Sequence, residues 1–257
     1  MSGLVYSPAP EGTRRILLTL SYDGTAYAGW QRQTNALAVQ QVVEAALACL
    51  EGAPVAVTGA SRTDAGVHAL GQRAHFDTRG RIPAEKYPFA LNTLLPRDVR
   101  VCAALEVAAD FHARFSACGK EYAYQMHNAP HASALERDHT AHVPVSLEEE
   151  AMRAALPALL GTHDFAAFQA AGGTAKTTVR TLSRATLERE GERLTLTVAG
   201  NAFLYNMVRI IAGTLIEIGN GKLGVNAFAV ALRTGDRLAL GPTAPPRGLI
   251  LRQVDYP

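Results

Sequence analysis

Residues 182–201 contain two stretches of alternating apolar and polar side chains, separated by a short polar segment. In the second stretch, "ERLTLTVAGN", the apolar residues Leu194, Leu196 and Val198 occupy every other position. A period of two places alternate side chains on opposite faces of a β-strand. The intervening "REGER" is typical of a tight turn, so we expect a hairpin whose two strands pair antiparallel.

Helical patterns are interspersed among the predicted strands in no regular order. Residues 35–52 predict a helix with Asn35 as its N-cap and Gly52 as its end. Residues 146–161 open with the capping-box pattern Ser-x-x-Glu, and residues 204–219 predict a strongly apolar helix. Because regular strand–helix alternation is missing and hairpins require antiparallel pairing, the sequence favours the α+β class over a doubly wound sheet.

The order of the predicted elements indicates two similar halves. We expect a mainly antiparallel, mixed sheet that is fused across the halves and flanked by helices, with a central cleft. The predicted organisation is a flexible N-terminal arm at residues 1–13, an N-terminal α+β half at residues 14–110 and a C-terminal α+β half at residues 111–257.

Composition and cysteine count limit the class of protein further. With 48% apolar and 19% charged residues, the chain has an ordinary globular composition, and its net charge of +2 neither requires nor excludes nucleic acid. Cys49, Cys102 and Cys118 form no Cys-x-x-Cys pair, which disfavours both a zinc ribbon and a disulfide framework. No segment resembles a signal peptide or a membrane span, so we expect a cytoplasmic protein without membrane contact.

The stretch "TGASRTDAGVHALGQRAHFDT", residues 58–78, gathers most of the potentially reactive side chains. A metal site there would use His68, His75 and Asp77, but the stretch has neither a His-Glu-x-x-His motif nor a cysteine pair. It also lacks the glycine density of a phosphate-binding loop, and the chain contains no Gly-x-Ser-x-Gly. We therefore expect no metal, no nucleotide cofactor and no serine nucleophile.

Asp64 in this stretch has two interpretations. An aspartate before Ala-Gly is typical of a turn, where its carboxylate hydrogen-bonds the backbone two residues on. Alternatively, the nearby charge of Arg62 would keep the carboxylate ionised in a poorly solvated cleft, where it could act as a nucleophile. A glycosidase-like reaction would need Asp77 as a second acid. The residues alone leave these alternatives open.

Two further residues also have a structural and a functional interpretation. Tyr122 in "KEYAYQ" is either a half-buried strand residue or a stacking platform for a base, with Lys120 nearby for a phosphate. Arg209 lies in an apolar helical segment, where an unpaired buried charge is costly. It either extends to the surface or pairs with a carboxylate from the other half.

Several separate motifs, in the same order, resemble those of the tRNA pseudouridine synthases of the TruA type. The resemblance covers nearly the whole chain and rests on "YDGTAYAGWQRQ" at 22–33, "SRTDAGVHA" at 61–69, "FHARFSA" at 111–117, "KEYAY" at 120–124, "NAFLYNMVRIIAG" at 201–213 and "TAPPRGLILRQVDYP" at 243–257. One departure is Ser61, where the family usually has glycine. If the backbone needs a positive φ there, serine costs about 1 kcal/mol.

The resemblance implies the pseudouridine synthase fold and an isomerase that converts uridine to pseudouridine at positions 38, 39 and 40 of the tRNA anticodon stem-loop. It implies a homodimer that needs no cofactor and no metal. The family's nucleophilic aspartate falls on Asp64 and its active-site tyrosine on Tyr122. Its two site arginines fall on Arg62 and Arg209. A uridine in a stem would have to be flipped out to react.

Basic side chains at the rim of the expected cleft would bind RNA phosphates. The candidates are Arg14, Arg15, Arg32 and Lys120. The alternative function is a non-catalytic RNA-binding protein on the same scaffold, which would retain these basic residues without needing Asp64.

Overall fold

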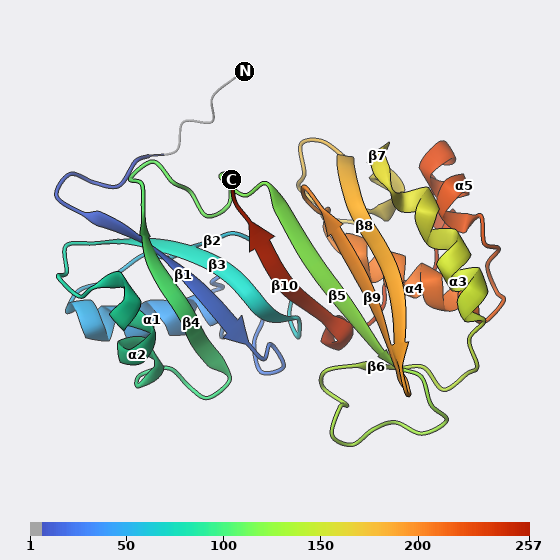
Figure 1. Ribbon diagram of the computed structural model, residues 1–257, viewed down its shortest axis with the longest axis horizontal. Helices are drawn as coiled ribbons and strands as arrows, with labels where there is room; N and C mark the ends of the chain where they lie inside the picture. The colour runs from blue at the N-terminus through green and yellow to red at the C-terminus, as the bar shows by residue number, and fades with distance from the viewer. Residues whose placement is uncertain (1–6) are drawn as a thin grey trace. The chain divides into compact units, whose positions relative to one another are not determined.

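The computed structural model describes residues 7–257, which form two compact units (Figure 1). The first contains residues 7–118 together with Leu251–Pro257, and the second contains Gly119–Ile250. The division thus falls after residue 118 rather than after residue 110, and the last residues belong to the first unit. Of the predicted N-terminal arm, residues 1–6 lie outside the described part, and the Ala9 N–H donates to the Ala109 carbonyl at 2.8 Å.

The first unit is built on a sheet with the strand order β4-β1-β3-β10, with β2 paired to β3. Its strands are β1 (Arg14–Tyr22), β2 (Thr58–Gly59), β3 (His68–Thr78), β4 (Val99–Val107) and β10 (Leu249–Asp255). Its helices are α1 (Val39–Glu51) and α2 (Tyr87–Asn92), the latter after a short 3-10 turn (Ala84–Lys86). β1 pairs antiparallel with both β3 and β4.

One face of this sheet forms the apolar core of the first unit. On β1, Ile16, Leu18 and Leu20 are fully buried at alternate positions, as the sequence predicts. Phe76 of β3 pairs directly with Ile16 and therefore lies on the same face. Its ring packs edge-on against Tyr87 of α2, with the ring centroids 5.3 Å apart. Such aromatic pairs add about 0.5–1.5 kcal/mol beyond their buried area.

The opposite face of the sheet carries several polar side chains, which hold the segment that follows β4. Arg15 donates two hydrogen bonds to the carboxylate of Asp77, both at 2.8 Å, and a third to the Phe111 carbonyl at 2.7 Å. The Nδ1 atom of His75 accepts the Ala113 N–H at 3.1 Å. These contacts attach residues 111–118 to the first unit, which explains why the division of the chain differs from the sequence expectation.

The second unit has a mixed sheet with the strand order β5-β9-β8-β7, and β6 pairs parallel with β5. Its strands are β5 (Gly119–His127), β6 (Ala141–His142), β7 (Gly161–Asp164), β8 (Val179–Glu190) and β9 (Arg193–Gly200). Its helices are α3 (Glu149–Ala155), α4 (Met207–Gly219) and α5 (Ala227–Thr234), with 3-10 turns at Leu156–Leu159, Ala166–Phe168, Arg237–Ala239 and Pro246–Gly248. Within residues 7–257, no helix combines the length and apolar character that crossing a membrane requires.

β8 and β9 form the predicted hairpin. Glu190 pairs with Arg193 at its closed end, and Gly191 in the turn adopts a φ of 59°. The alternating apolar side chains of β9 are fully buried, as the sequence predicts. The α+β class with a mixed, mostly antiparallel arrangement of strands is therefore confirmed.

The start of α1 differs from its predicted N-cap. The Leu37 carbonyl accepts the Ala28 N–H at 2.8 Å, which holds the preceding residues in a loop. Asn35 therefore lies outside the helix, which begins after Ala38. The predicted end is confirmed, because Gly52 terminates the helix in the left-handed conformation with a φ of 71°.

The start of α3 also lies later than its capping signal predicts. The N–H of Glu148, the residue before the helix, donates to the Gly219 carbonyl at the end of α4 at 2.7 Å. This tertiary contact fixes the entry of the helix, so Ser146 does not cap it. The helix therefore starts later than predicted, because the Gly219 carbonyl, which is distant in sequence, accepts the Glu148 N–H.

We predict that His75 makes the folded protein sensitive to mild acid. Burial is the main cause that lowers its pKa from 6.5 to about 4, and the charges of Arg15 and His112 add to it while Asp77 opposes it. The unfolded chain therefore takes up a proton below about pH 6.5 that the folded protein takes up only near pH 4. The free energy of unfolding should decrease as the pH falls through this window.

Urea denaturation at several pH values between about 7 and 4.5 measures this dependence. In the matched variant His75→Asn, an amide oxygen can accept the Ala113 N–H but cannot titrate. The variant should therefore lose stability less steeply in this range, with a difference of at most about 1.4 kcal/mol per pH unit. Identical slopes for the two proteins would show that His75 is not the group responsible.

Candidate active site

Asp64 lies in a tight turn between β2 and β3. Its carbonyl accepts the Val67 N–H at 3.1 Å, and Gly66 within the turn has a φ of 75°. Glycine adopts this left-handed conformation without the strain that a Cβ atom would cause. Thr63 on one side of Asp64 is buried, whereas Asp64 itself is partly exposed. Asp64 is therefore a turn residue, and the turn also presents it at the surface of the first unit.

A close backbone crossing holds the peptide that precedes Asp64. The Thr63 carbonyl accepts the Trp30 N–H at 3.0 Å, and the Thr63 hydroxyl lies 2.8 Å from the Tyr22 hydroxyl. A Cβ atom on Gly29 would lie 2.3 Å from the Thr63 carbonyl oxygen, closer than real Cβ atoms approach. Gly29 also has a φ of 94°, so both space and backbone conformation require glycine there.

A second crossing holds the other end of the turn. A Cβ atom on Gly24 would lie 2.0 Å from the Val67 carbonyl oxygen. The Gly24 N–H donates to Nδ1 of the buried His68 at 3.0 Å, and a carboxylate oxygen of Asp23 lies 3.1 Å from the same nitrogen. His68 thus supports the loop at residues 23–30, consistent with a structural role. Gly24 and Gly29, both in "YDGTAYAGW", are the sequence signal for these crossings. Neither composition nor the spacing of apolar residues reveals that signal.

Ser61 causes no backbone strain. Among the described non-glycine residues, only Asn206 has a positive φ, so the expected cost of serine at position 61 does not arise. The Ser61 backbone is paired on both sides with the Gln72 side chain, which accepts its N–H at 3.2 Å and donates to its carbonyl at 2.7 Å. The buried Ser61 hydroxyl has no hydrogen-bond partner among the described residues.

Arg62 does not form the expected ion pair with Asp64. Its side chain is exposed, and it makes no hydrogen bond or ion pair with any described residue of the first unit. A guanidinium presented in this way can contact an external phosphate. Its position therefore fits contact with a nucleic acid better than a role in holding the carboxylate.

Tyr122 lies in β5 of the second unit and is 8% exposed. Its ring packs edge-on against Phe203, with the centroids 5.0 Å apart and an interplanar angle of 78°. Tyr124, two residues on, points to the same face and donates its hydroxyl to the Pro245 carbonyl at 2.8 Å. Burial raises the pKa of Tyr124, so its hydroxyl stays protonated. The two tyrosines thus lie on the same face of β5.

Arg209 is half-buried near the start of α4, and neutral oxygen atoms hold its guanidinium. Nη1 donates to Oδ1 of Asn206 at 2.8 Å, and Nε donates to the Ala244 carbonyl at 2.8 Å. The Ala244 N–H in turn donates to the Arg209 carbonyl at 3.0 Å. The side chain is therefore fixed in direction rather than extended freely into water.

Close packing keeps the Ala244 segment against α4. A Cβ atom on Gly213 would lie 1.8 Å from the Pro242 carbonyl oxygen, so only glycine allows the segment to cross the helix at this point. Thr214 strengthens the contact, because its hydroxyl accepts the Gly241 N–H at 2.9 Å. The anchor of the Arg209 guanidinium thus belongs to a tightly packed part of the unit.

The arginines expected to bind RNA have partners within the first unit. Arg14 pairs with Glu106 at 2.9 Å, and Arg32 pairs with the largely buried Glu44. Arg15 is 4% exposed and bound to Asp77, as described above. The fourth candidate, Lys120, is half-buried at the start of β5. The geometry gives Arg15 a structural role and does not single out the others as RNA contacts.

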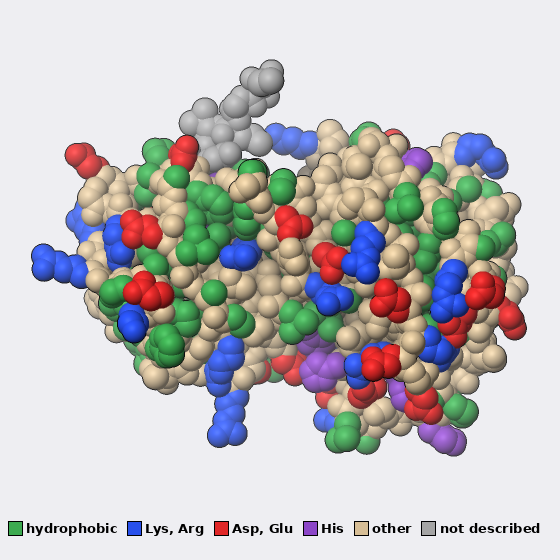
Figure 2. All heavy atoms as spheres, in the orientation of Figure 1, with side chains coloured by type: hydrophobic (Ala, Val, Ile, Leu, Met, Phe, Trp, Pro, Cys, Tyr) green, Lys and Arg blue, Asp and Glu red, His purple; other side chains and the backbone are tan. Residues whose placement is uncertain are grey.

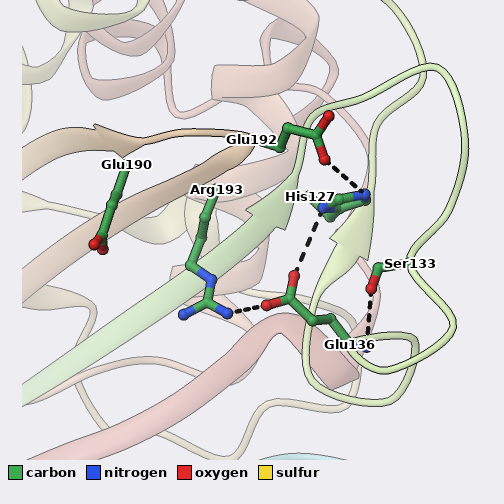
Figure 3. Close-up of a pocket in the computed structure, with 6 residues that line it drawn as sticks. All are labelled: His127, Ser133, Glu136, Glu190, Glu192 and Arg193. Carbon is green, nitrogen blue, oxygen red and sulfur yellow. Dashed lines mark hydrogen bonds and ion pairs between the residues drawn. The ribbon is translucent and has the colours of Figure 1, made fainter.

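A polar pocket of about 470 Å³ in the second unit was not expected from the sequence (Figure 3). Its lining residues are His127, Ser133, Glu136, Glu190, Glu192 and Arg193. The His127 ring lies 3.6 Å from a Glu136 oxygen and 3.8 Å from a Glu192 oxygen, and Arg193 pairs with Glu136. Because it contains three carboxylates, the pocket disfavours phosphate, and its ion pairs join the loop after β5 to the β8–β9 turn.

Positive and negative side chains are interspersed on the face of the second unit that Figure 2 presents. In the β8 region, Arg184 lies 3.3 Å from Glu121 and 3.7 Å from Glu188, and Arg189 pairs with Glu149. Paired charges of this kind attract RNA phosphates less than an unbalanced basic surface does. This face therefore offers no argument for RNA binding.

Comparison with known proteins relates the chain to one family. The sequence pattern of the family described as tRNA pseudouridine synthase matches residues 19–116 and 155–257. The matched segments include Asp64 and Arg209, whereas Tyr122 falls between them.

Curated relatives match along almost the entire chain. The tRNA pseudouridine synthase A of Ruminiclostridium cellulolyticum is 49% identical over 244 residues, which cover 95% of this chain and 100% of that protein. The protein of the same name from Acetivibrio thermocellus is 47% identical over 243 residues, with the same coverage. That of Halalkalibacterium halodurans is 48% identical over 238 residues, covering 92% of this chain and 90% of the relative. With the fold and motifs described above, these matches show that the chain belongs to the tRNA pseudouridine synthase family.

Proposed function

We propose that the protein isomerises uridine to pseudouridine at positions 38, 39 and 40 in the anticodon stem-loop of tRNA, with Asp64 as the nucleophile. The family assignment supports an isomerase that acts on tRNA. The observation that carries the role of Asp64 is its partly exposed position in a turn that two glycine crossings fix. A nucleophile needs this combination of access and fixed position.

The proposed reaction breaks the N-glycosidic bond, turns the base over and forms a carbon–carbon bond between the base and the sugar. Substrate and product have the same mass, so neither an oxidant nor a second substrate is needed. The uridine must first leave the base stack, which costs a few kcal/mol. The ionised carboxylate of Asp64 then attacks either the sugar or the base, and both routes require the same charged form.

The other site residues would bind and orient the substrate. We propose that Arg209 pairs with the reacting carboxylate, because the motif resemblance places the family's helix arginine here and two hydrogen bonds fix the direction of its guanidinium. Tyr122 would stack on the flipped base, and the exposed Arg62 would contact the phosphates of the tRNA backbone. The motif resemblance further supports a homodimer in the cytoplasm.

We predict that Asp64→Asn abolishes isomerisation while tRNA still binds. Asparagine has the shape of aspartate but lacks the negative charge, so the turn should persist and the nucleophile should be lost. With tRNA tritiated at uridine C5, isomerisation releases the label into water, and the initial rate should fall by more than about 1,000-fold. Asp110→Asn, which changes an exposed carboxylate of the same unit, is the matched control and should retain the rate.

The same assay separates the alternative functions. A non-catalytic RNA-binding protein would release no tritium even as the wild type, and a glycosidase-like enzyme would release the free base. Wild-type activity in the Asp64→Asn variant would contradict the proposed role of Asp64.

We predict that Arg62→Ala weakens tRNA binding and lowers its salt dependence. Each phosphate contact releases condensed counterions, so the logarithm of the binding constant decreases linearly with the logarithm of the salt concentration. Loss of one contact should reduce that slope by about 1. Arg233→Ala, which removes an exposed arginine in the last turn of α5, shows how much any surface arginine contributes. An unchanged slope for Arg62→Ala, or a flat salt response of the wild type, would contradict the proposed phosphate contact.

A further inference from the structure

Asn206 combines an unusual backbone conformation with an unusual hydrogen bond. It is the only described non-glycine residue with a positive φ, at φ 60° and ψ 8°. Side chains with a Cβ atom are disfavoured in this left-handed region, and asparagine tolerates it better than most. Residues held in such conformations are concentrated at functional sites, where the surrounding structure maintains them.

The side chain of Asn206 does not perform the task that its position predicts. Asn206 directly precedes α4, where an asparagine commonly accepts a backbone N–H of the first helical turn. No such side-chain cap is formed. Instead, Oδ1 accepts Nη1 of Arg209 at 2.8 Å. The helix thus loses a stabilising cap, and the amide oxygen is used to hold one guanidinium.

The Arg209 guanidinium is held at two atoms on different sides. Asn206 binds Nη1, and the Ala244 carbonyl binds Nε. Two contacts fix the plane of the group as well as its distance from the backbone. Both of these acceptors are uncharged, so neither adds a negative charge beside the arginine. An aspartate in place of Asn206 would orient the group equally well but would compete for its charge.

We infer that Asn206 is a positioning residue, whose left-handed backbone and amide oxygen hold Arg209 in the orientation needed for isomerisation. The inference rests on the proposed function, in which Arg209 pairs with the reacting carboxylate. Neither the backbone conformation of Asn206 nor its amide contact alone would hold Arg209 in this orientation. The conformation brings the side chain back toward the helix, and the amide supplies a neutral acceptor within reach of Nη1.

The substitution Asn206→Gly separates this role from a purely structural one. Glycine adopts a φ of 60° without strain, so the variant should fold and melt at the wild-type temperature or above it. It removes the acceptor of Nη1, so the rate of tritium release should fall by about 10-fold or more in single-turnover conditions. The dissociation constant for tRNA should stay within about twofold, because Asn206 acts through Arg209 in the reaction.

Two further variants complete the test. Asn220→Gly makes the same substitution at the other end of α4, where the asparagine side chain accepts the Lys222 N–H at 3.1 Å, and it should retain the rate. Asn206→Asp keeps an acceptor but introduces a negative charge beside Arg209. It should remain folded and should also be slow, because the new carboxylate would compete with the reacting carboxylate for the guanidinium.

The rate of tritium release by Arg209→Lys, measured in parallel, distinguishes a failure of the role inferred for Asn206 from a failure of the proposed function. A full rate for Arg209→Lys would show that the arginine is dispensable, and that part of the proposed function would fall. A slow Arg209→Lys together with a wild-type rate for Asn206→Gly would overturn only the role of Asn206. A lowered melting temperature for Asn206→Gly would also overturn it, because the contact would then be structural.

Discussion

One close backbone crossing in the first unit determines where the candidate nucleophile lies. The Thr63 carbonyl accepts the Trp30 N–H while Gly29 passes beside it, at a distance that leaves no room for a Cβ atom. Because Asp64 follows directly, this crossing fixes the peptide that carries the carboxylate. Gly24 packs equally closely against the far end of the turn. The position of the carboxylate is therefore set by the backbone of a loop some forty residues earlier in the chain.

Much of the fold followed from local patterns, and the differences arose where distant partners intervened. Alternation of apolar residues predicted the β8–β9 hairpin, because side-chain period reports directly on which face is buried. Capping signals misplaced the start of α1 after Asn35 and of α3 at Ser146, since tertiary hydrogen bonds satisfy the preceding backbone. Likewise, the link between Arg15 and Phe111 places the segment after β4 in the first unit. No local pattern in the sequence reveals such contacts.

The structural surroundings of the candidate site residues were only partly predictable from the sequence. Residue chemistry left Asp64 undecided between turn and nucleophile, and only the set of ordered motifs favoured the second interpretation. Spacing does not determine where long side chains point, so the expected pair of Arg62 with Asp64 is not formed. Arg15 is bound to Asp77 because two distant strands lie side by side. The hydrogen bond from Arg209 to Asn206 accompanies a left-handed backbone conformation of Asn206 that no local pattern in the sequence predicts.

We propose that the fixed turn places the Asp64 carboxylate for reaction, so that its position matters as much as its charge. The substitution Asp64→Glu tests it directly, because glutamate retains the charge and moves the carboxylate by one methylene group. The measurement is the single-turnover rate of pseudouridine formation on a saturating tRNA substrate. We expect a decrease of at least about 100-fold with tRNA affinity unchanged. A rate within about threefold of the wild type would contradict it, because a mobile carboxylate would then be sufficient.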